Sequence, residues 1–454
     1  MGFSNVEKWD WRYAFLKNFV DFNFKSYFRS VTVSGKENIP ENKPIIFAPN
    51  HQNALMDALA LLTTTKGQPV FLARSDIFKK SLLAKALSFL KMIPIYRIRD
   101  GYGNLKFNDD ILRKITTILA KNHTMVIFPE GNHGDKRFLR PLKKGICRMA
   151  FQAEEAYNYK LDIQIVPVGL DYTNYYKFNH NLFVNFGKPI PVQDYISLYK
   201  EAPSKAYLKI LGKISEELKK LMIQVNNSQY YLLINELREI YKYKMKDYLK
   251  LPNLKHSNKF TADKELIRTC EQAIEDKPEE AKDAYHKLRT YRKCRRKLGL
   301  REWVFQKAPF SWAGNIAQIP LLLVMFPVFV YGFINHILPA FLPLYYSKKM
   351  KDKQFWSSVR STMTLITFPV FYLLQFLVVY LIIQDFQFAL IYLLSLPVTG
   401  IIAYHYSVWF KKLRAKLKYN ILKLKRNRTM EEAIKLRTEL IEIVNSWFNR
   451  EVEL

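Results

Sequence analysis

The chain has 454 residues and 49% of them are hydrophobic, which excludes a disordered protein and allows the cores of two or three domains. Its 71 Lys and Arg residues outnumber its 40 Asp and Glu residues, so the formal net charge is +31. This excess predicts attraction to an anionic partner, which charge alone leaves open as nucleic acid, a membrane surface or a phosphorylated substrate.

The amino-terminal segment, residues 1–30, interleaves aromatic side chains with Lys and Arg. This pattern is typical of an amphipathic helix at a membrane interface, with core packing as the alternative explanation for the rings. The segment lacks the apolar core of a signal peptide, and Val6 stands where the myristoylation pattern requires Ser or Thr. We therefore expect neither export nor lipidation.

Residues 31–202 are predicted to form an α/β domain, a mixed sheet flanked by helices. Short β-rich runs alternate there with helical stretches such as "SLLAKALSFL" and "NDDILRKITTILAKN". The predicted strands are "PIIFA", "VFLA", "IPIY", "TMVIF", "IQIVPV" and "LFVNF".

The remaining chain is predicted to be helical. Residues 203–307 are charged and show apolar residues at spacings of three and four, which indicates a helical connector. Residues 308–410 contain three long runs without Asp, Glu, Lys or Arg, and a membrane span needs about 20 apolar residues. Because basic segments flank these runs, we expect an even number of crossings, as two hairpins, the first alternatively re-entrant and the second turning at Asp385. Residues 411–454 are predicted to form a basic cytoplasmic helical tail.

The stretch "FAPNHQNALMDALAL" places His51 in the turn after a predicted strand and Asp57 in the following helix. On a regular helix, six residues rotate a side chain by about 600°, so the turn must fold back for the two groups to meet. If it does, Asp57 accepts a hydrogen bond from one imidazole nitrogen and leaves the other to take a proton from an alcohol. Taken alone, the pair fits an ordinary structural turn better.

Other polar groups also follow predicted strands. Glu130 and Gly131 come after "TMVIFP", where a simple strand-ending turn is the alternative, and Arg97 follows "IPIY", where its fork of donors suits a phosphate and a surface ion pair is the alternative. The buried strand "IQIVPV" is expected to contribute Pro167 and Val168 to a pocket wall, together with Pro129.

In this order, the motifs resemble the glycerolipid acyltransferase superfamily, which includes glycerol-3-phosphate and lysophosphatidic acid acyltransferases. The resemblance covers roughly residues 30–200. The matching blocks are "NHQNALMD", "IPIYR", "FPEGNHGDKRFLRPLKKG" and "IVPVG".

The resemblance implies transfer of a fatty acyl group from acyl-CoA or acyl carrier protein to a glycerol hydroxyl, without a metal or cofactor. His51 would be the general base and Asp57 its orienting partner. The implied acceptor site consists of Arg97, Glu130, Gly131, Arg140, Lys143 and Lys144. The implied location is the membrane, with the catalytic domain on the cytoplasmic face.

Two departures from the family pattern bear on the acceptor. Five residues rather than four separate His51 from Asp57, which resembles some glycerol-3-phosphate and dihydroxyacetone-phosphate acyltransferases. The third block continues with Asn132 and His133 where the family commonly has Thr and Arg. Arg137 or Arg140 is the candidate replacement for that missing phosphate-binding arginine.

Four rival hypotheses remain. A metal site using His51, Glu130 and His133 is disfavoured because the segment is rich in Pro and Gly where no helix is expected, and the three cysteines have no zinc-type spacing. A nucleic-acid binder is disfavoured by the membrane segments and the lack of a reader motif. A phospholipid-remodelling lysophospholipid acyltransferase or transacylase would use the same base, and a non-catalytic membrane scaffold would share the fold.

Overall fold

The computed structural model describes residues 6–96, 107–134 and 136–448. The chain divides into two compact units. The first contains residues 1–224 and 347–361, and the second contains residues 225–346 and 362–454. The first unit is an α/β domain built on one sheet, and the second is helical.

The sheet of the first unit is mixed, as predicted. Its order is β1-β7-β6-β2-β5-β3-β4, with β8 paired to β6. Pairing is parallel except where β6 meets β7 and β8. The strands are β1 (Ser30–Ser34), β2 (Ile45–Pro49), β3 (Val70–Arg74), β4 (Met92–Ile95), β5 (Thr124–Val126), β6 (Gln164–Tyr172), β7 (Asn181–Phe186) and β8 (Ile190–Pro191).

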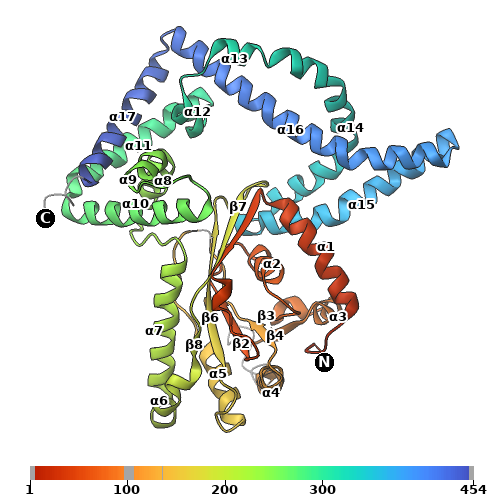
Figure 1. Cartoon of the computed structure of the whole chain (residues 1–454), viewed down its shortest axis with the longest axis vertical. Helices are drawn as coiled ribbons and strands as arrows, with labels where there is room; N and C mark the ends of the chain where they lie inside the picture. Colours follow the sequence, from red (N-terminus) through yellow and green to blue (C-terminus); the bar gives the residue numbers. More distant parts are fainter. Residues whose placement is uncertain (1–5, 97–106, 135, 449–454) are drawn as a thin grey trace. The chain divides into compact units, whose positions relative to one another are not determined.

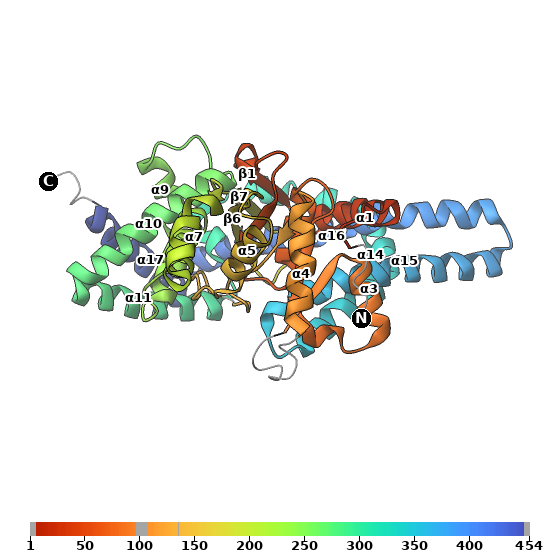
Figure 2. The ribbon, with the colours of Figure 1, turned by 90° about the horizontal axis from the view of Figure 1, so that it is seen from below.

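Helices cover both faces of this sheet. Strand β2 is therefore buried on both sides, and every residue in it is buried. Ile46 and Ala48 belong to one core cluster, whereas Ile45 and Phe47 belong to the other. The first cluster is completed by α4 (Phe107–Ala120), α5 (Gly145–Ala156) and α7 (Pro203–Leu221), which Figure 2 shows side by side. The second is completed by α1 (Trp11–Tyr27) and α2 (Leu55–Thr64). The short helices α3 (Ser81–Phe89) and α6 (Ile196–Glu201) complete the unit.

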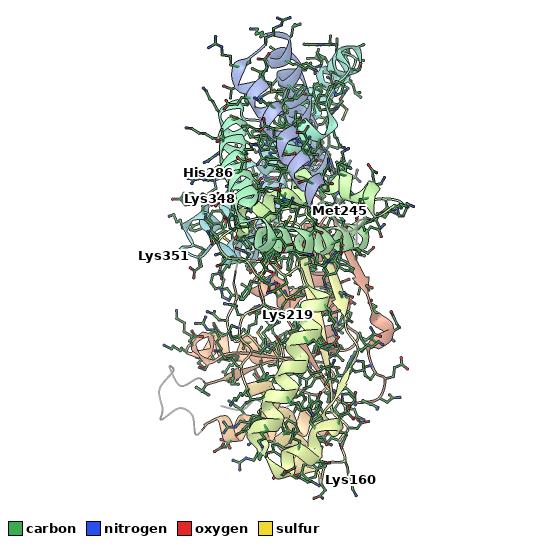
Figure 3. The ribbon with its side chains drawn as sticks, turned by 90° about the vertical axis from the view of Figure 1, so that its left-hand side faces the viewer. Lys160, Lys219, Met245, His286, Lys348 and Lys351 are labelled. Carbon is green, nitrogen blue, oxygen red and sulfur yellow. The ribbon has the colours of Figure 1, made fainter. Side chains whose placement is uncertain are left out.

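Three segments belong to the α/β unit although the sequence predicts them to be outside it. Helix α1 buries Phe24 in the core, and α7 buries Ile210 and Ile214, so neither is a separate module. Residues 347–361, between two apolar helices, also belong to this unit. Lys348 and Lys351 extend outwards from that segment (Figure 3).

The second unit begins with the charged helices of the predicted connector and ends with the tail. They are α8 (Tyr231–Ile240), α9 (Lys242–Tyr248), α10 (His256–Asp276), α11 (Pro278–Leu298), α12 (Glu302–Lys307) and α17 (Arg428–Phe448). Tail helix α17 packs along α11, and Glu302 joins them by accepting hydrogen bonds from Arg295 and Arg437, both 2.9 Å long.

Three segments of the described chain are long and apolar enough to cross a membrane. They contain α13 (Trp312–Ile316) with α14 (Ile319–Lys349), α15 (Trp356–Ile383) and α16 (Phe386–Leu424). The prediction that residues 308–347 form a hairpin is wrong, because α14 is a single curved helix (Figure 1). Its internal Pro327, Pro339 and Pro343 bend the helix without ending it, which apolar helices tolerate.

Polar side chains join these apolar helices. Asn335 of α14 accepts a hydrogen bond from Tyr392 of α16 (2.6 Å) and, through its carbonyl, another from Gln375 of α15 (2.8 Å). At Gly332 a Cβ would lie 2.3 Å from the carbonyl oxygen of Thr399, so only glycine permits this approach of α14 and α16. Small residues and interhelical hydrogen bonds are the usual means of packing helices in lipid.

Candidate active site

The turn between β2 and α2 folds back and brings His51 to Asp57. Ala54 lies within it at φ 45° and ψ −124°, a conformation that residues with a side chain rarely adopt and that costs about 1–3 kcal/mol. Asp57 lies in the first turn of α2, where its Oδ2 is 2.8 Å from Nδ1 of His51. The strained turn therefore creates the pair that a regular helix would separate.

Asp57 is fully buried and saturated with hydrogen-bond donors. Its Oδ2 also accepts the backbone N–H groups of Gln52 (2.8 Å) and Asn53 (2.7 Å), and its Oδ1 accepts the hydroxyl of Tyr172 (2.8 Å). Burial and the neighbouring carboxylate raise the pKa of Tyr172 well above 10, so this hydroxyl stays a donor. With Asp57 held as an acceptor, His51 carries its proton on Nδ1 and leaves Nε2 free to act as a base.

The His51 backbone is fixed from two sides. Its N–H donates to Oε1 of Glu130 (2.7 Å). The preceding Asn50 exchanges two hydrogen bonds with the backbone of Leu170 in β6, at 2.6 and 3.1 Å. The His51 ring stacks on Phe128 with 4.1 Å between centroids, and 16% of the side chain stays exposed. A base held this firmly and partly open to solvent can meet a substrate hydroxyl.

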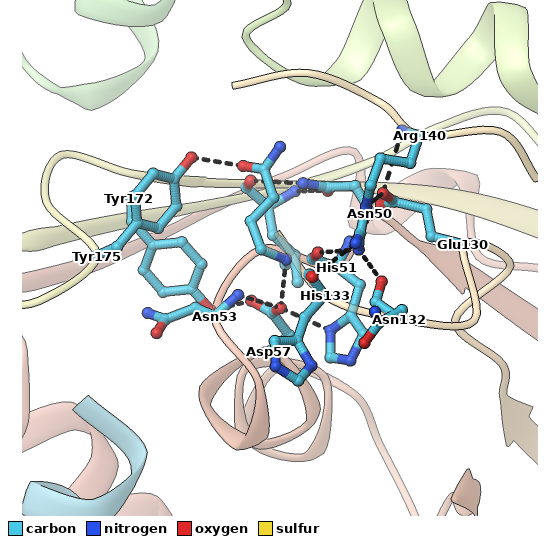
Figure 4. A network of polar contacts seen from close by, with 12 residues as sticks. Asn50, His51, Asn53, Asp57, Glu130, Asn132, His133, Arg140, Tyr172 and Tyr175 are labelled. Atoms are coloured by element: carbon cyan, nitrogen blue, oxygen red, sulfur yellow. Dashed lines mark hydrogen bonds and ion pairs between the residues drawn. The ribbon is translucent and has the colours of Figure 1, made fainter. Parts of the chain in front are cut away.

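Glu130 and Arg140 form the frame of this site (Figure 4). Oε2 of Glu130 accepts from Nε of Arg140 (3.0 Å) and from its backbone N–H (3.2 Å). The rest of the guanidinium donates to backbone carbonyls, among them that of His133 (2.6 Å). Burial raises the pKa of Glu130, against the opposing effect of the His51 N–H and Arg140. Both side chains position the His51 loop, and their predicted contact with the acceptor stays a prediction.

The other residues predicted to bind the acceptor differ in their burial and in whether their charges are already paired. Arg137 is buried against Asp171, the carbonyl of Tyr172 and the ring of Tyr175, so its charge is already paired within the protein. Lys143 and Lys144 are exposed, and Gly131 adopts a left-handed φ of 67°. Arg97 lies outside the described residues.

The predicted pocket-wall residues lie on adjoining chain segments. Pro167 and Val168 are buried in β6, paired in register with Ala48 and Pro49 of β2. Pro129 follows Phe128, and its carbonyl accepts the N–H of Lys143 at 2.7 Å. The parallel pairing of β2 with β6 explains how these segments meet beside His51, while a lining role stays a prediction.

A metal site receives no support from the described part of the chain, where no group of three or more His, Cys, Asp or Glu side chains is placed to hold an ion. Glu130, which the metal hypothesis needs as a ligand, directs its two oxygens to the His51 N–H and to Arg140.

We expect Arg140→Ala to destabilise the protein by about 2 kcal/mol, because it leaves the nearly buried Glu130 carboxylate without its cation. This expected loss of stability is smaller than for a fully buried ion pair because 29% of the Arg140 side chain is exposed. Thermal unfolding in detergent measures the change, and exposed Lys160→Ala is the matched control. An unfolding temperature equal to that of the wild type would contradict the framing role.

Comparison with known proteins agrees with the geometry. The Acyltransferase family model matches residues 30–171. Glycerol-3-phosphate O-acyltransferase 1 of Saccharomyces cerevisiae is 24% identical over 212 residues, 46% of this chain and 27% of the relative. 1-acyl-sn-glycerol-3-phosphate acyltransferase LPAT1, chloroplastic, of Arabidopsis thaliana is 27% identical over 144 residues, 32% of this chain and 36% of the relative.

One solved structure, the 1-acyl-sn-glycerophosphate (LPA) acyltransferase PlsC of Thermotoga maritima, aligns with 45% of this chain and 80% of its own at 19% identity. Its TM-score is 0.32. The match to the yeast relative spans about a quarter of that relative's length. Residues 30–171 are thus similar to the acyltransferase family, in agreement with the resemblance read from the motifs.

Proposed function

We propose that this chain is a membrane-bound acyltransferase that moves a fatty acyl group from acyl-CoA or acyl carrier protein to a hydroxyl of glycerol 3-phosphate or lysophosphatidic acid. The observation that carries the proposal is the His51–Asp57 pair, 2.8 Å apart at the end of β2 in an acyltransferase domain. The ends of strands in open α/β sheets are where such domains bind substrates.

The chemistry follows from the orientation of His51. Its free Nε2 takes the proton of the acceptor hydroxyl as the oxygen attacks the thioester carbon. The carbonyl π electrons move to oxygen, return as the C–S bond breaks, and the leaving thiolate takes the proton from His51. The buried Asp57 carboxylate stabilises the transient imidazolium. Because the thioester is already activated, this reaction requires neither a metal nor a cofactor.

Glycerol 3-phosphate is the first acceptor to test. Two Saccharomyces cerevisiae relatives are named glycerol-3-phosphate O-acyltransferases, and one is 31% identical to this chain over 135 residues. The five residues between His51 and Asp57 point the same way. Lysophosphatidic acid follows, because other relatives are named for it as 1-acyl-sn-glycerol-3-phosphate acyltransferases.

The proposed location is the membrane, with the catalytic domain on the cytoplasmic face. In the α/β unit, an aromatic face on and beside α1 is left exposed, consistent with an interfacial helix. It consists of Trp9, Trp11, Phe15 and Phe22, each between 67% and 76% exposed. The basic residues 287–307, 348–360 and 411–428 support a cytoplasmic side for the segments between apolar helices.

Chain connectivity further constrains α14. Residues 225–311, which precede α13, include no candidate span, and residues 347–361, which contain the end of α14 and the start of α15, belong to the α/β unit. Because basic segments stand on both sides of it, we propose that this curved helix enters the membrane without crossing it. Only α15 and α16 cross, as a hairpin with Asp385 capping the start of α16 on the far side.

Cysteine labelling tests this topology. We expect Arg296→Cys and Lys351→Cys to react with a membrane-impermeant maleimide from the same side of sealed proteoliposomes, and Gln384→Cys from the other. These three sites are exposed, whereas the native cysteines Cys147, Cys270 and Cys294 are buried. Labelling of the first two variants from opposite sides would show that α14 crosses.

An acceptor panel tests the function itself. Purified protein in detergent is given one labelled acyl-CoA with glycerol 3-phosphate, dihydroxyacetone phosphate, lysophosphatidic acid or a neutral lysophospholipid. Labelled product from a phosphorylated glycerol acceptor supports the proposal. Product from the neutral lysophospholipid alone would identify a remodelling enzyme. Transfer of an acyl group from an intact phospholipid would identify a transacylase. No product with any donor would identify a non-catalytic scaffold.

A further inference from the structure

A second histidine lies beside the proposed base. The rings of His133 and His51 meet edge to face, with centroids 5.4 Å apart. Figure 4 shows the two rings next to each other on the side of the network away from Arg140. His133 is the fourth residue of "EGNH", where the family commonly has arginine, so its chemistry is not supplied by the family pattern.

The backbone around His133 is tied to that of His51. The N–H of Gly134 donates to the His51 carbonyl (3.1 Å), and Arg140 donates to the His133 carbonyl (2.6 Å). Arg140 in turn is held by Glu130, which also binds the His51 N–H. The two imidazoles are therefore carried by one cross-linked loop pair, and their separation is fixed by it.

Phe355 also packs against His133. The two rings are perpendicular, at 82°, with centroids 4.7 Å apart. Phe355 lies between α14 and α15, within residues 347–361, which belong to the α/β unit. This segment is fastened to the loop after β6, because Ser357 and Arg360 donate to the carbonyls of Tyr175 and Tyr176, both at 2.5 Å.

The nitrogens of His133 have no hydrogen-bond partner among the residues that the structure describes. Within the described residues, its ring makes contacts with the rings of His51 and Phe355 and no hydrogen bond. Burial and the neighbouring His51 lower the pKa of His133 to about 4. At neutral pH the ring is thus uncharged, with one N–H to donate, and does not repel the imidazolium that forms on His51.

We propose that His133 is a second active-site histidine that donates a hydrogen bond to the thioester carbonyl oxygen, and that Phe355 holds it in place. The inference deepens the proposed function and rests on it. While His51 takes the acceptor proton, the thioester oxygen gains negative charge and needs a fixed donor close by. A neutral imidazole serves as such an electrophile elsewhere in enzymes.

This assignment gives residues 347–361 a part in catalysis. The segment runs directly into α15, which begins at Trp356, one residue after Phe355. Trp356 itself meets Tyr176 edge to face, with centroids 6.2 Å apart. A loop between two apolar helices thus completes the active site, and Phe355 acts as a positioning residue rather than a catalytic one.

Substitutions that separate packing from hydrogen bonding test the proposal. His133→Phe keeps an aromatic ring against Phe355 but has no N–H, whereas His133→Gln keeps a donor without the ring. We expect His133→Phe and His133→Ala to lower kcat about 100-fold, as loss of one oxyanion donor does, with the acceptor KM nearly unchanged. His133→Gln should recover at least part of that kcat, and Phe355→Ala should lower kcat less than His133→Phe does.

The controls separate the possible failures. Tyr157→Ala, at an exposed ring in the same unit, should keep wild-type kcat, and thermal unfolding checks that each variant is folded. Wild-type kcat in His133→Phe, or a change confined to the acceptor KM, overturns the donor role. If His51→Ala is inactive at the same time, the proposed function stands. If the wild type acylates no acceptor, both proposals fall.

Discussion

We expect His51→Ala to abolish acyl transfer, lowering kcat by about 10³-fold or more, because it removes the imidazole that we propose takes the acceptor's proton. The protein should stay folded. The remaining partners of Asp57, the N–H groups of Gln52 and Asn53 and the hydroxyl of Tyr172, stay in place. The missing ring loses its stacking on Phe128 and one hydrogen bond, a loss of about 1–2 kcal/mol. Single-turnover acylation with labelled acyl-CoA measures the effect.

The control for this experiment is His286→Ala, which changes an exposed histidine on α11 in the other unit. It should acylate like the wild type. Turnover in His51→Ala that approaches the wild-type value would remove His51 as the base. The same outcome would leave the fold and the similarity to the acyltransferase family untouched, because neither depends on this imidazole.

The strands were predictable because most of them are short continuous apolar runs, as strands buried on both faces must be. The strand β1 was missed because "SVTVS" is polar and its residues are only partly buried. Helix α7 has an ordinary amphipathic pattern, which predicts a helix but not its partner. Only the structure shows that its buried residues Ile210 and Ile214 face the sheet rather than the connector.

The site was predictable where its residues are close in sequence. His51 and Asp57 share one turn, and a backfolding turn was the condition for their contact. Tyr172 and Asn50 were not identified, because their roles depend on the register of β2 against β6, which brings together residues more than 110 positions apart. Phe355 was also missed because its partner is distant in sequence: it packs on His133 from the segment that joins two apolar helices.

The error at α14 has a physical cause. The apolar run of residues 308–347 contains Pro320, Pro327, Pro339 and Pro343 together with Asn335 and His336, and in water such a pattern breaks a helix. Here Asn335 and its partners on α15 and α16 satisfy polar groups from the side, so the helix continues. The expectation of an even number of crossings was drawn from charge and is independent of this error.

The second large effect is expected for Asp57→Asn, because that variant removes the negative charge while keeping the shape. An asparagine oxygen in the position of Oδ2 still accepts from His51, Gln52 and Asn53. Its amide nitrogen then faces the Tyr172 oxygen, which has lone pairs to receive it. The reverse orientation would set an N–H₂ group against three donors, so the His51 tautomer is preserved.

Because Asp57→Asn retains the geometry of the site, the change in kcat measures the effect of removing the negative charge of Asp57. We expect Asp57→Asn to lower kcat by about 10²–10⁴-fold, because the imidazolium formed on His51 loses its carboxylate partner. The buried Tyr172 proton loses its acceptor, at about 1–3 kcal/mol of stability. Asp57→Asn with Tyr172→Phe removes the unpaired hydroxyl and should not regain kcat. Recovery of kcat in the double variant would mean that the unpaired hydroxyl, and not the missing charge, had slowed the reaction.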